Sequence, residues 1–213
     1  MELFNSIQRK EGTMKKLFLF FIIGMCAISI SSANEDLGLP VGVQAPDFEA
    51  ATYDGGQVKL SEITKDGPAV LIFYRGGWCP YCNRQLQELQ SRLEEFQSTG
   101  ATIVAISVDR QEKAAESVEG GGLGFTVVSD PEAGLLELYN IVYHVPDELV
   151  KKYKEEYKID LERDSGETHH IIAVPAAFVV NRSGKIVFAY VNEDYKVRVS
   201  TDALLEALKN LDQ

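Results

Sequence analysis

The 213-residue sequence is poor in the residues that build disulfide and metal frameworks. It contains only 3 cysteines and 3 histidines. Three cysteines are too few for a disulfide-dense scaffold and one too few for a four-cysteine zinc site. Basic residues are also scarce, because 21 Lys and Arg oppose 32 Asp and Glu, giving a formal net charge of −11. This charge offers no attraction to a nucleic acid backbone, so we expect no nucleic acid partner.

The sequence also lacks the signs of several domains. From residue 34 onward there is no internal repeat, no low-complexity stretch and no linker rich in Gly, Ser or Pro. We therefore predict one domain over residues 34–213. The glycine-rich stretch Gly120–Gly124 lacks the third glycine of the dinucleotide fingerprint and precedes a predicted strand. We interpret it as a flexible loop and expect no organic cofactor and no metal.

Residues 1–33 have the order of a secretory signal peptide. Lys15 and Lys16 precede an apolar run from Leu17 to Ile30, and small residues follow up to Ala33. This order predicts a start at Met14 and cleavage after Ala33. We therefore expect an exported, periplasmic protein. The alternative is an uncleaved membrane anchor, although the apolar run is shorter than the roughly 20 residues that span a bilayer.

Cleavage would leave two cysteines in the mature protein. Cys26 lies inside the apolar run, and Met25 before it is not the small residue that a lipoprotein signal requires. We expect no lipidation there. Cys79 and Cys82 then remain, in a compartment where disulfides persist.

Strands and helices alternate along the predicted domain. Apolar runs predict strands, and apolar residues at three- and four-residue steps predict helices. The expected strands are 70–73, 102–108, 125–128, 178–180 and 186–190. The expected helices are a long one carrying residues 86–96, 111–118, one that starts at Pro131, 146–157 and 201–211. This alternation predicts an α/β fold with a mostly parallel central sheet, helices on both faces and a C-terminal antiparallel hairpin.

Residues 143–172 interrupt the alternation with a charged segment. We interpret this segment as an insertion that contains the helix from Pro146 to about Tyr157. A solvated helix over the sheet edge is favoured over a lid that covers a substrate, because charged runs usually form surface.

The motif Trp78-Cys79-Pro80-Tyr81-Cys82 joins the first buried strand to the first long helix. Two cysteines three apart at a helix start lie on the same side of its first turn. Unpaired N–H groups and the helix dipole stabilise negative charge there, which predicts Cys79 as the attacking thiolate and Cys82 as the resolving thiol. Pro80 suits the first turn. Gly76 and Gly77 allow a sharp turn that we expect to leave the sulfur accessible.

The cysteine pair has two other possible interpretations. Half of a zinc site would need a second ligand pair, and the adjacent histidines His169 and His170 would point to opposite faces of a strand. A purely structural disulfide would close so small a ring that it would remove little entropy from the unfolded chain. A redox-active pair is therefore favoured over both.

Several motifs together resemble the thioredoxin-fold superfamily and, within it, the alkyl hydroperoxide reductase/thiol-specific antioxidant (peroxiredoxin-like) family. The resemblance covers about residues 41–211. It rests on Gly42–Phe48 with Val58–Glu62 as an N-terminal hairpin, Val70–Cys82, Ile103–Asp109 and Val174–Val180. It implies a thioredoxin-like fold and an antioxidant thiol-disulfide oxidoreductase that works through a reversible disulfide without a cofactor. Its partners would be a thiol or disulfide protein and an electron donor of thioredoxin type.

The resemblance leaves the order of attack open. The peroxiredoxin pattern Pro-x-x-x-Thr-x-x-Cys would place Arg75 at its proline, Cys79 at its threonine and Cys82 at its peroxide-attacking cysteine. The alternative function is therefore a peroxidase in which Cys82 attacks hydrogen peroxide or an organic hydroperoxide. Where that family has a second arginine, Val174 and Pro175 instead resemble the cis-proline corner of thioredoxin. That corner favours thiol-disulfide exchange, because its backbone can pair with a peptide substrate. A redox-inert binding module is the third possibility.

Other residues are predicted to surround the pair. Arg75 could stabilise either thiolate with its fixed charge, or be an ordinary surface arginine. Trp78 most simply packs beside the loop. Asp109 ends a strand near the same edge, where a turn-forming role is favoured over proton handling. Tyr195 and Arg198 can pack near the redox loop in a fold of this kind, although their spacing does not require it.

Overall fold

The computed structural model describes residues 37–212. The predicted start at Met14, the cleavage site after Ala33 and Cys26 lie outside the described residues and remain predictions. No helix within 37–212 is both long enough and apolar enough to cross a bilayer.

A five-stranded sheet forms the centre of the fold, in the order β5-β4-β3-β8-β9. Its strands are β3 (Ala69–Phe73), β4 (Thr102–Ser107), β5 (Thr126–Ser129), β8 (Ala176–Val180) and β9 (Ile186–Val191). The first three run parallel, whereas β8 is antiparallel to both β3 and β9. Every residue of β3 and β8 is buried, as their continuous apolar runs predict. The predicted sheet with its antiparallel hairpin is confirmed.

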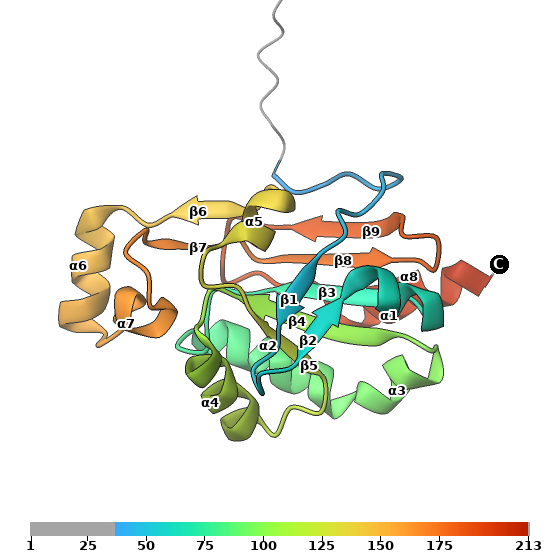
Figure 1. Ribbon diagram of the computed structural model, residues 1–213, viewed down its shortest axis with the longest axis horizontal. Coiled ribbons are helices and arrows are strands. Elements are labelled where there is room, and N and C mark those ends of the chain that lie inside the picture. Colours follow the sequence, from blue (N-terminus) through green and yellow to red (C-terminus); the bar gives the residue numbers. More distant parts are fainter. Residues whose placement is uncertain (1–36, 213) are drawn as a thin grey trace, which may run out of the picture. The chain divides into compact units, whose positions relative to one another are not determined.

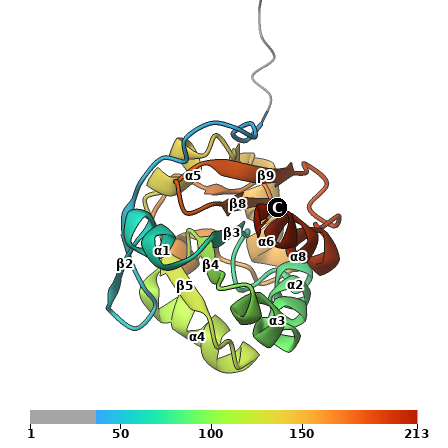
Figure 2. The same ribbon diagram turned by 90° about the vertical axis from the view of Figure 1, so that its right-hand side faces the viewer.

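Helices cover both faces of this sheet (Figure 2). One face carries α2 (Pro80–Ser91), α3 (Leu93–Ser98), α4 (Gln111–Gly121) and α8 (Thr201–Lys209), which ends in the 3-10 turn η1 (Asn210–Asp212). The other carries α1 (Leu60–Asp66) and α5 (Gly134–Leu138). Side chains alternate along β3, so that Leu71 and Phe73 pack on the second face while Ile72 packs on the first. The predicted α/β thioredoxin-like architecture is therefore confirmed.

Two predicted helices are shorter than their apolar periodicity suggests. Arg92, with φ −118°, separates α2 from α3. The helix expected from Pro131 begins only at Gly134, because Ala133 adopts a left-handed conformation with φ 60°. The Asp130 carboxylate accepts the N–H of Leu135 at 2.9 Å and so satisfies the first turn of this helix.

The predicted N-terminal hairpin has different bounds. Its strands are β1 (Glu49–Ala51) and β2 (Gln57–Lys59), and the residues directly after β2 begin α1 instead of continuing the strand. The Asp47 carboxylate accepts the Ser61 N–H at 2.8 Å, which satisfies one free donor of the first turn of α1. Gly42–Phe48 forms no strand within the described chain.

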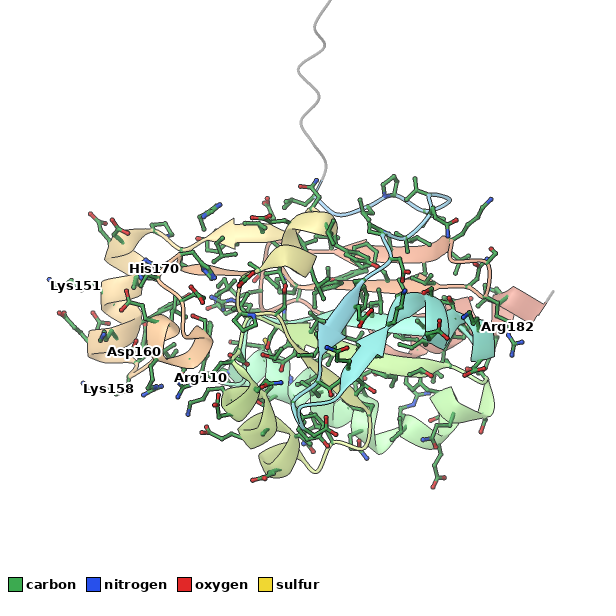
Figure 3. The ribbon with its side chains drawn as sticks, in the orientation of Figure 1. Arg110, Lys151, Lys158, Asp160, His170 and Arg182 are labelled. Carbon is green, nitrogen blue, oxygen red and sulfur yellow. The ribbon has the colours of Figure 1, made fainter. Side chains whose placement is uncertain are left out.

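The charged insertion is framed by a small antiparallel pair that the sequence did not reveal. Strands β6 (Val142–His144) and β7 (Ile171–Ala173) pair with each other, and α6 (Asp147–Glu156) and α7 (Leu161–Ser165) lie between them in the chain (Figure 1). The predicted helix 146–157 is confirmed as α6. Charged side chains such as Lys151 and Lys158 surround this end of the domain, opposite Arg182 in the β8–β9 turn (Figure 3).

Candidate active site

The redox loop, Tyr74–Cys79, leaves the carboxyl end of β3 and leads directly into α2. Cys79 is the N-cap residue of α2, and Pro80 occupies its first position. The N–H groups of Cys82 and Asn83 both donate to the Cys79 carbonyl at 3.0 Å. The motif therefore lies at a helix N-terminus, where a negative charge is stabilised.

The two cysteines are free thiols joined by a hydrogen bond between their side chains. The hydrogen bond from Cys82 lowers the pKa of Cys79 to about 6, against the opposing effect of burial, and the charges of Arg75 and Arg198 add to the decrease. Burial raises the pKa of Cys82, and the neighbouring Cys79 raises it further. At neutral pH the pair therefore holds its negative charge on Cys79.

Neither sulfur is accessible, which corrects the prediction of an exposed thiol. Cys79 is 1% exposed and Cys82 is 0% exposed. Both belong to the apolar cluster between the sheet and α2, and Trp78 and Tyr81 pack against that cluster. The glycines do turn the chain sharply, but the turn folds Trp78 over the cluster. A substrate reaches sulfur only after part of this cover moves.

Arg75 is buried, with 5% of its surface exposed, so its interpretation as a surface arginine is wrong. Its guanidinium donates to the Tyr153 hydroxyl at 2.5 Å and lies 4.2 Å from the ring of Tyr195 and 5.0 Å from that of Trp78. Tyr153 comes from α6 of the insertion. Most residues of α6 are exposed, as the prediction of a solvated helix requires, whereas Tyr153 packs onto the redox loop.

A cavity of about 540 Å³ opens beside Arg75. Its walls include Tyr153, Tyr195 and the corner formed by Val174 and Pro175. It places groups from the redox loop, the insertion and the segment before β8 around one space beside Arg75.

The corner at Val174 and Pro175 differs from the predicted cis-proline. No peptide bond in the described residues is cis. The Val174 N–H donates to the Ile141 carbonyl at 2.8 Å, and the Pro175 carbonyl accepts the Asn192 N–H at 3.1 Å. These backbone groups are already paired inside the fold. The pairing of β6 with β7 places Val174 opposite Ile141. The expected backbone pairing with a peptide substrate is therefore not supported at these two groups.

Asp109 follows β4 and lies directly beside the redox loop. It is 2% exposed. Its Oδ2 accepts the Gly77 N–H at 2.8 Å and the Ser107 hydroxyl at 3.0 Å. Burial raises the pKa of Asp109 to about 7 despite these hydrogen bonds. The interpretation of Asp109 as a turn-forming residue missed its contact with the redox loop. The parallel order of β3 and β4 could have indicated it, because parallel strands bring their carboxyl ends to one edge of the sheet.

Arg198 reaches the pair from the connection between β9 and α8. Its Nη2 lies 3.3 Å from the Cys82 sulfur. Tyr195 of the same connection packs on Tyr81 with ring centroids 5.6 Å apart. The structure thus brings both residues to the redox loop. No sequence spacing could have established the contact, since 116 positions separate Arg198 from Cys82.

The histidines lie elsewhere. His169 contacts the Pro131 carbonyl at 2.7 Å through Nε2, and His170 contacts Glu162 at 2.9 Å. Within residues 37–212 no three His, Cys, Asp or Glu side chains are grouped to hold a metal ion.

Residues 41–189 match the AhpC/TSA family. The chain belongs to this family. Among its relatives, peroxiredoxin Bcp of Bacillus subtilis (strain 168) is 29% identical over 173 residues, which cover 81% of this chain and 95% of that protein. Thiol-disulfide oxidoreductase ResA of the same organism is 24% identical, covering 60% of this chain and 74% of that protein.

The AhpC/TSA chain also shares its fold with solved structures. The crystal structure of peroxidoxin BcpB from Mycobacterium tuberculosis superposes with a TM-score of 0.64 at 20% identity, covering 82% of this chain and 98% of that one. The family membership and the relatives together identify the protein as a thiol-dependent oxidoreductase.

Proposed function

We propose that this AhpC/TSA protein catalyses thiol-disulfide exchange through Cys79 and Cys82, with Cys79 as the nucleophile. One observation carries the proposal: Cys79 is the N-cap residue of α2 and Cys82 lies in the first turn of the same helix, so the helix N-terminus and the neighbouring thiol both favour a thiolate on Cys79. The thiolate is the reactive form of cysteine, so Cys79 is the sulfur prepared for attack at neutral pH.

The reaction proceeds in two exchanges. The Cys79 thiolate attacks one sulfur of a substrate disulfide, which forms a mixed disulfide and releases the other substrate sulfur as a thiolate. Cys82 then loses its proton to water and attacks the Cys79 sulfur. The Cys79–Cys82 disulfide forms and the second substrate thiolate leaves, so that two electrons pass from the pair to the substrate. The same steps in reverse oxidise a dithiol substrate.

The relative named thiol-disulfide oxidoreductase ResA supports this function. In the proposed reaction a thiol or disulfide protein is the substrate and a thioredoxin-type protein is the electron donor. Alkylation of the thiols across a graded series of dithiol buffers tests it by giving the reduction potential. A catalytic pair is expected to lie above about −300 mV, where structural disulfides are not found. A pair that stays oxidised below that potential would identify a structural disulfide on a redox-inert module.

A peroxidase is the second candidate, favoured by the guanidinium that Arg198 places on Cys82 and by the relatives named peroxiredoxins. In this reaction the Cys82 thiolate attacks the hydroperoxide oxygen, forming a sulfenic acid and releasing an alcohol or water. The Cys79 thiol then attacks the Cys82 sulfur, releasing water as the disulfide forms.

Stopped-flow oxidation by hydrogen peroxide separates the two functions. Oxidation no faster than that of a free thiol would exclude the peroxidase function. Rapid oxidation that is lost in Cys82→Ser but retained in Cys79→Ser would instead overturn Cys79 as the first nucleophile.

We also propose that the protein is exported to the periplasm, on the basis of the signal-peptide order of residues 14–33. N-terminal sequencing of the protein expressed from its full reading frame tests this. A mature chain that begins at Asn34 is expected, and a chain that keeps residues 14–33 in the membrane fraction would support the anchor instead.

A further inference from the structure

A single connection carries Arg198 to the resolving sulfur. This connection joins β9 to α8, and its buried Val199 anchors it to the same apolar cluster as the cysteines. Tyr195 fixes its outer side by packing on Tyr81 and on the guanidinium of Arg75. The contact between Arg198 and Cys82 is therefore set by packing on both sides of the connection.

Arg198 has no acidic partner within the described residues. Its Nη1 donates to the Val197 carbonyl at 3.2 Å, and its buried Nε has no hydrogen-bond partner. The Cys82 sulfur is thus the only side-chain atom in the described chain to which this guanidinium makes a hydrogen bond. A partly buried cation such as Arg198 gains most from a neighbour that becomes negative, and Cys82 becomes negative only when it loses its proton.

The peroxiredoxin pattern would place its second arginine near Pro175, which carries no charge. Arg198 supplies a guanidinium from a different connection of the chain. Its contact is with Cys82, whereas Cys79 receives its hydrogen bond from the Cys82 thiol. Arg198 therefore makes its hydrogen bond to the Cys82 sulfur, while its charge is only a minor influence on Cys79.

We propose that Arg198 is a catalytic residue of the second exchange, in which its guanidinium stabilises the negative charge on the Cys82 sulfur as that sulfur attacks Cys79. This inference rests on the proposed function. Once Cys79 is held in a mixed disulfide it no longer bears a negative charge, so its repulsion of a Cys82 thiolate disappears. The Cys82 proton passes to water, and Arg198 remains beside the thiolate that forms.

The test uses the full reduced protein and one equivalent of 5,5′-dithiobis(2-nitrobenzoate) in a stopped-flow instrument. Attack by Cys79 releases a first thionitrobenzoate, and closure by Cys82 releases a second. We expect Arg198→Gln to slow the second release about tenfold or more, the size of a one-unit loss of thiolate stabilisation, and to leave the first release within about threefold. Arg198→Lys, which keeps the charge, is expected to recover part of the rate.

The pH dependence of the second release gives an independent readout. The titratable and charged groups that face Cys82 are Cys79 from the α2 N-terminus, Tyr74 from the start of the redox loop, and Arg198 from the connection between β9 and α8. Loss of Arg198 is expected to move the midpoint of the second release to higher pH. The control is Arg84→Gln, which removes an exposed arginine of α2 that lies over Tyr81 and contacts no sulfur. It is expected to change neither release.

The outcomes separate the inference from the function on which it rests. Failure of the wild type to give a second release would overturn the proposed thiol-disulfide exchange itself. Two releases in the wild type with an unchanged second release in Arg198→Gln would overturn only the role of Arg198. Equal slowing of both releases would show that Arg198 supports the loop as a whole, which also overturns the proposal.

Discussion

The Asp109 carboxylate accepts the backbone N–H of Gly77 at 2.8 Å and so ties the end of β4 to the redox loop that follows β3. The carboxyl group is buried, and burial raises the pKa of Asp109 to about 7. The Asp109 carboxyl group, whose charged form is disfavoured by burial, therefore holds the redox loop at Gly77, two residues before Cys79. Buried carboxyl groups of this kind are common at active sites.

The first prediction concerns Asp109 and the pH dependence of stability. Because its pKa is raised on folding, the folded protein binds more protons than the unfolded chain between about pH 4 and pH 7. The contribution of Asp109 to the free energy of unfolding is therefore full at low pH and lost as pH rises through 7, by roughly 4 kcal/mol at most. Asp109→Asn should remove this loss, since an amide oxygen still accepts the Gly77 N–H.

Urea denaturation at pH 5 and pH 8 measures this effect. Burial also raises the pKa of Asp130 to about 6. Asp109→Asn should therefore still lose some free energy of unfolding between pH 5 and pH 8, but less than the wild type. The exposed Asp66→Asn serves as a control and should keep the wild-type slope. An equal difference between the two pH values in wild type and Asp109→Asn would contradict the prediction.

The second prediction concerns the thiolate. Alkylation of Cys79 by iodoacetamide should have its pH midpoint near 6, because the Cys82 thiol donates to it. Cys82→Ala removes that donor and should move the midpoint upward. Cys79→Ala, the reciprocal variant, should leave Cys82 with an alkylation midpoint above that of an ordinary thiol, because burial holds the Cys82 pKa above its usual range. Unchanged midpoints would show that the hydrogen bond has no influence on reactivity.

The third prediction concerns the close approach of Gly77 to α4. A β-carbon at Gly77 would overlap the Ser117 hydroxyl. Gly77→Ala should therefore destabilise the protein by about 1–3 kcal/mol and disturb the loop before Cys79. The double variant Gly77→Ala with Ser117→Ala should recover most of the loss in a denaturant titration. In Gly120→Ala, also in α4, the new β-carbon would have no heavy atom within 4 Å, so this variant should be neutral or stabilising. A double variant as unstable as Gly77→Ala alone would place the strain elsewhere.

The fourth prediction concerns the insertion. Within the described residues, the Tyr153 hydroxyl is the only one that accepts a hydrogen bond from the buried Arg75 guanidinium. Tyr153→Phe removes this acceptor and should lower the free energy of unfolding by about 1.5–3 kcal/mol. It should also slow the reaction of Cys79, because Arg75 contributes to its low pKa. Tyr157→Phe, an exposed tyrosine near the end of α6, should stay within about 0.5 kcal/mol of wild type. Similar losses in both variants would argue that α6 acts only through general packing.

The elements with a strong local pattern were predictable. Continuous apolar runs located β3, β4 and β8, and the cysteine pair at the strand-helix junction followed from its position alone. The failures have physical causes. Ala133 adopts a left-handed conformation that no propensity rule assigns to alanine. Strands β6 and β7 are three residues each and pair across the whole insertion, so neither has a recognisable period.

The surroundings of the site were less predictable than its cysteines. Arg75 is buried only because Tyr153, Trp78 and Tyr195 surround it, and these residues come from three separate segments of the chain. The accessibility of Cys79 was wrong for the same reason, since local sequence does not reveal what distant segments place on top of it. Tertiary contacts between segments decide both burial and charge environment here.

Tyr195 and Arg198 lie on the same short connection between β9 and α8. A displacement of that connection that uncovers Cys82 also withdraws the guanidinium from its sulfur. Exposure to solvent would relieve the burial that holds the Cys82 pKa high, whereas loss of the guanidinium would remove a charge that favours the Cys82 thiolate. The two changes act on Cys82 in opposite directions, so this one connection controls both the access to the resolving thiol and its ionisation.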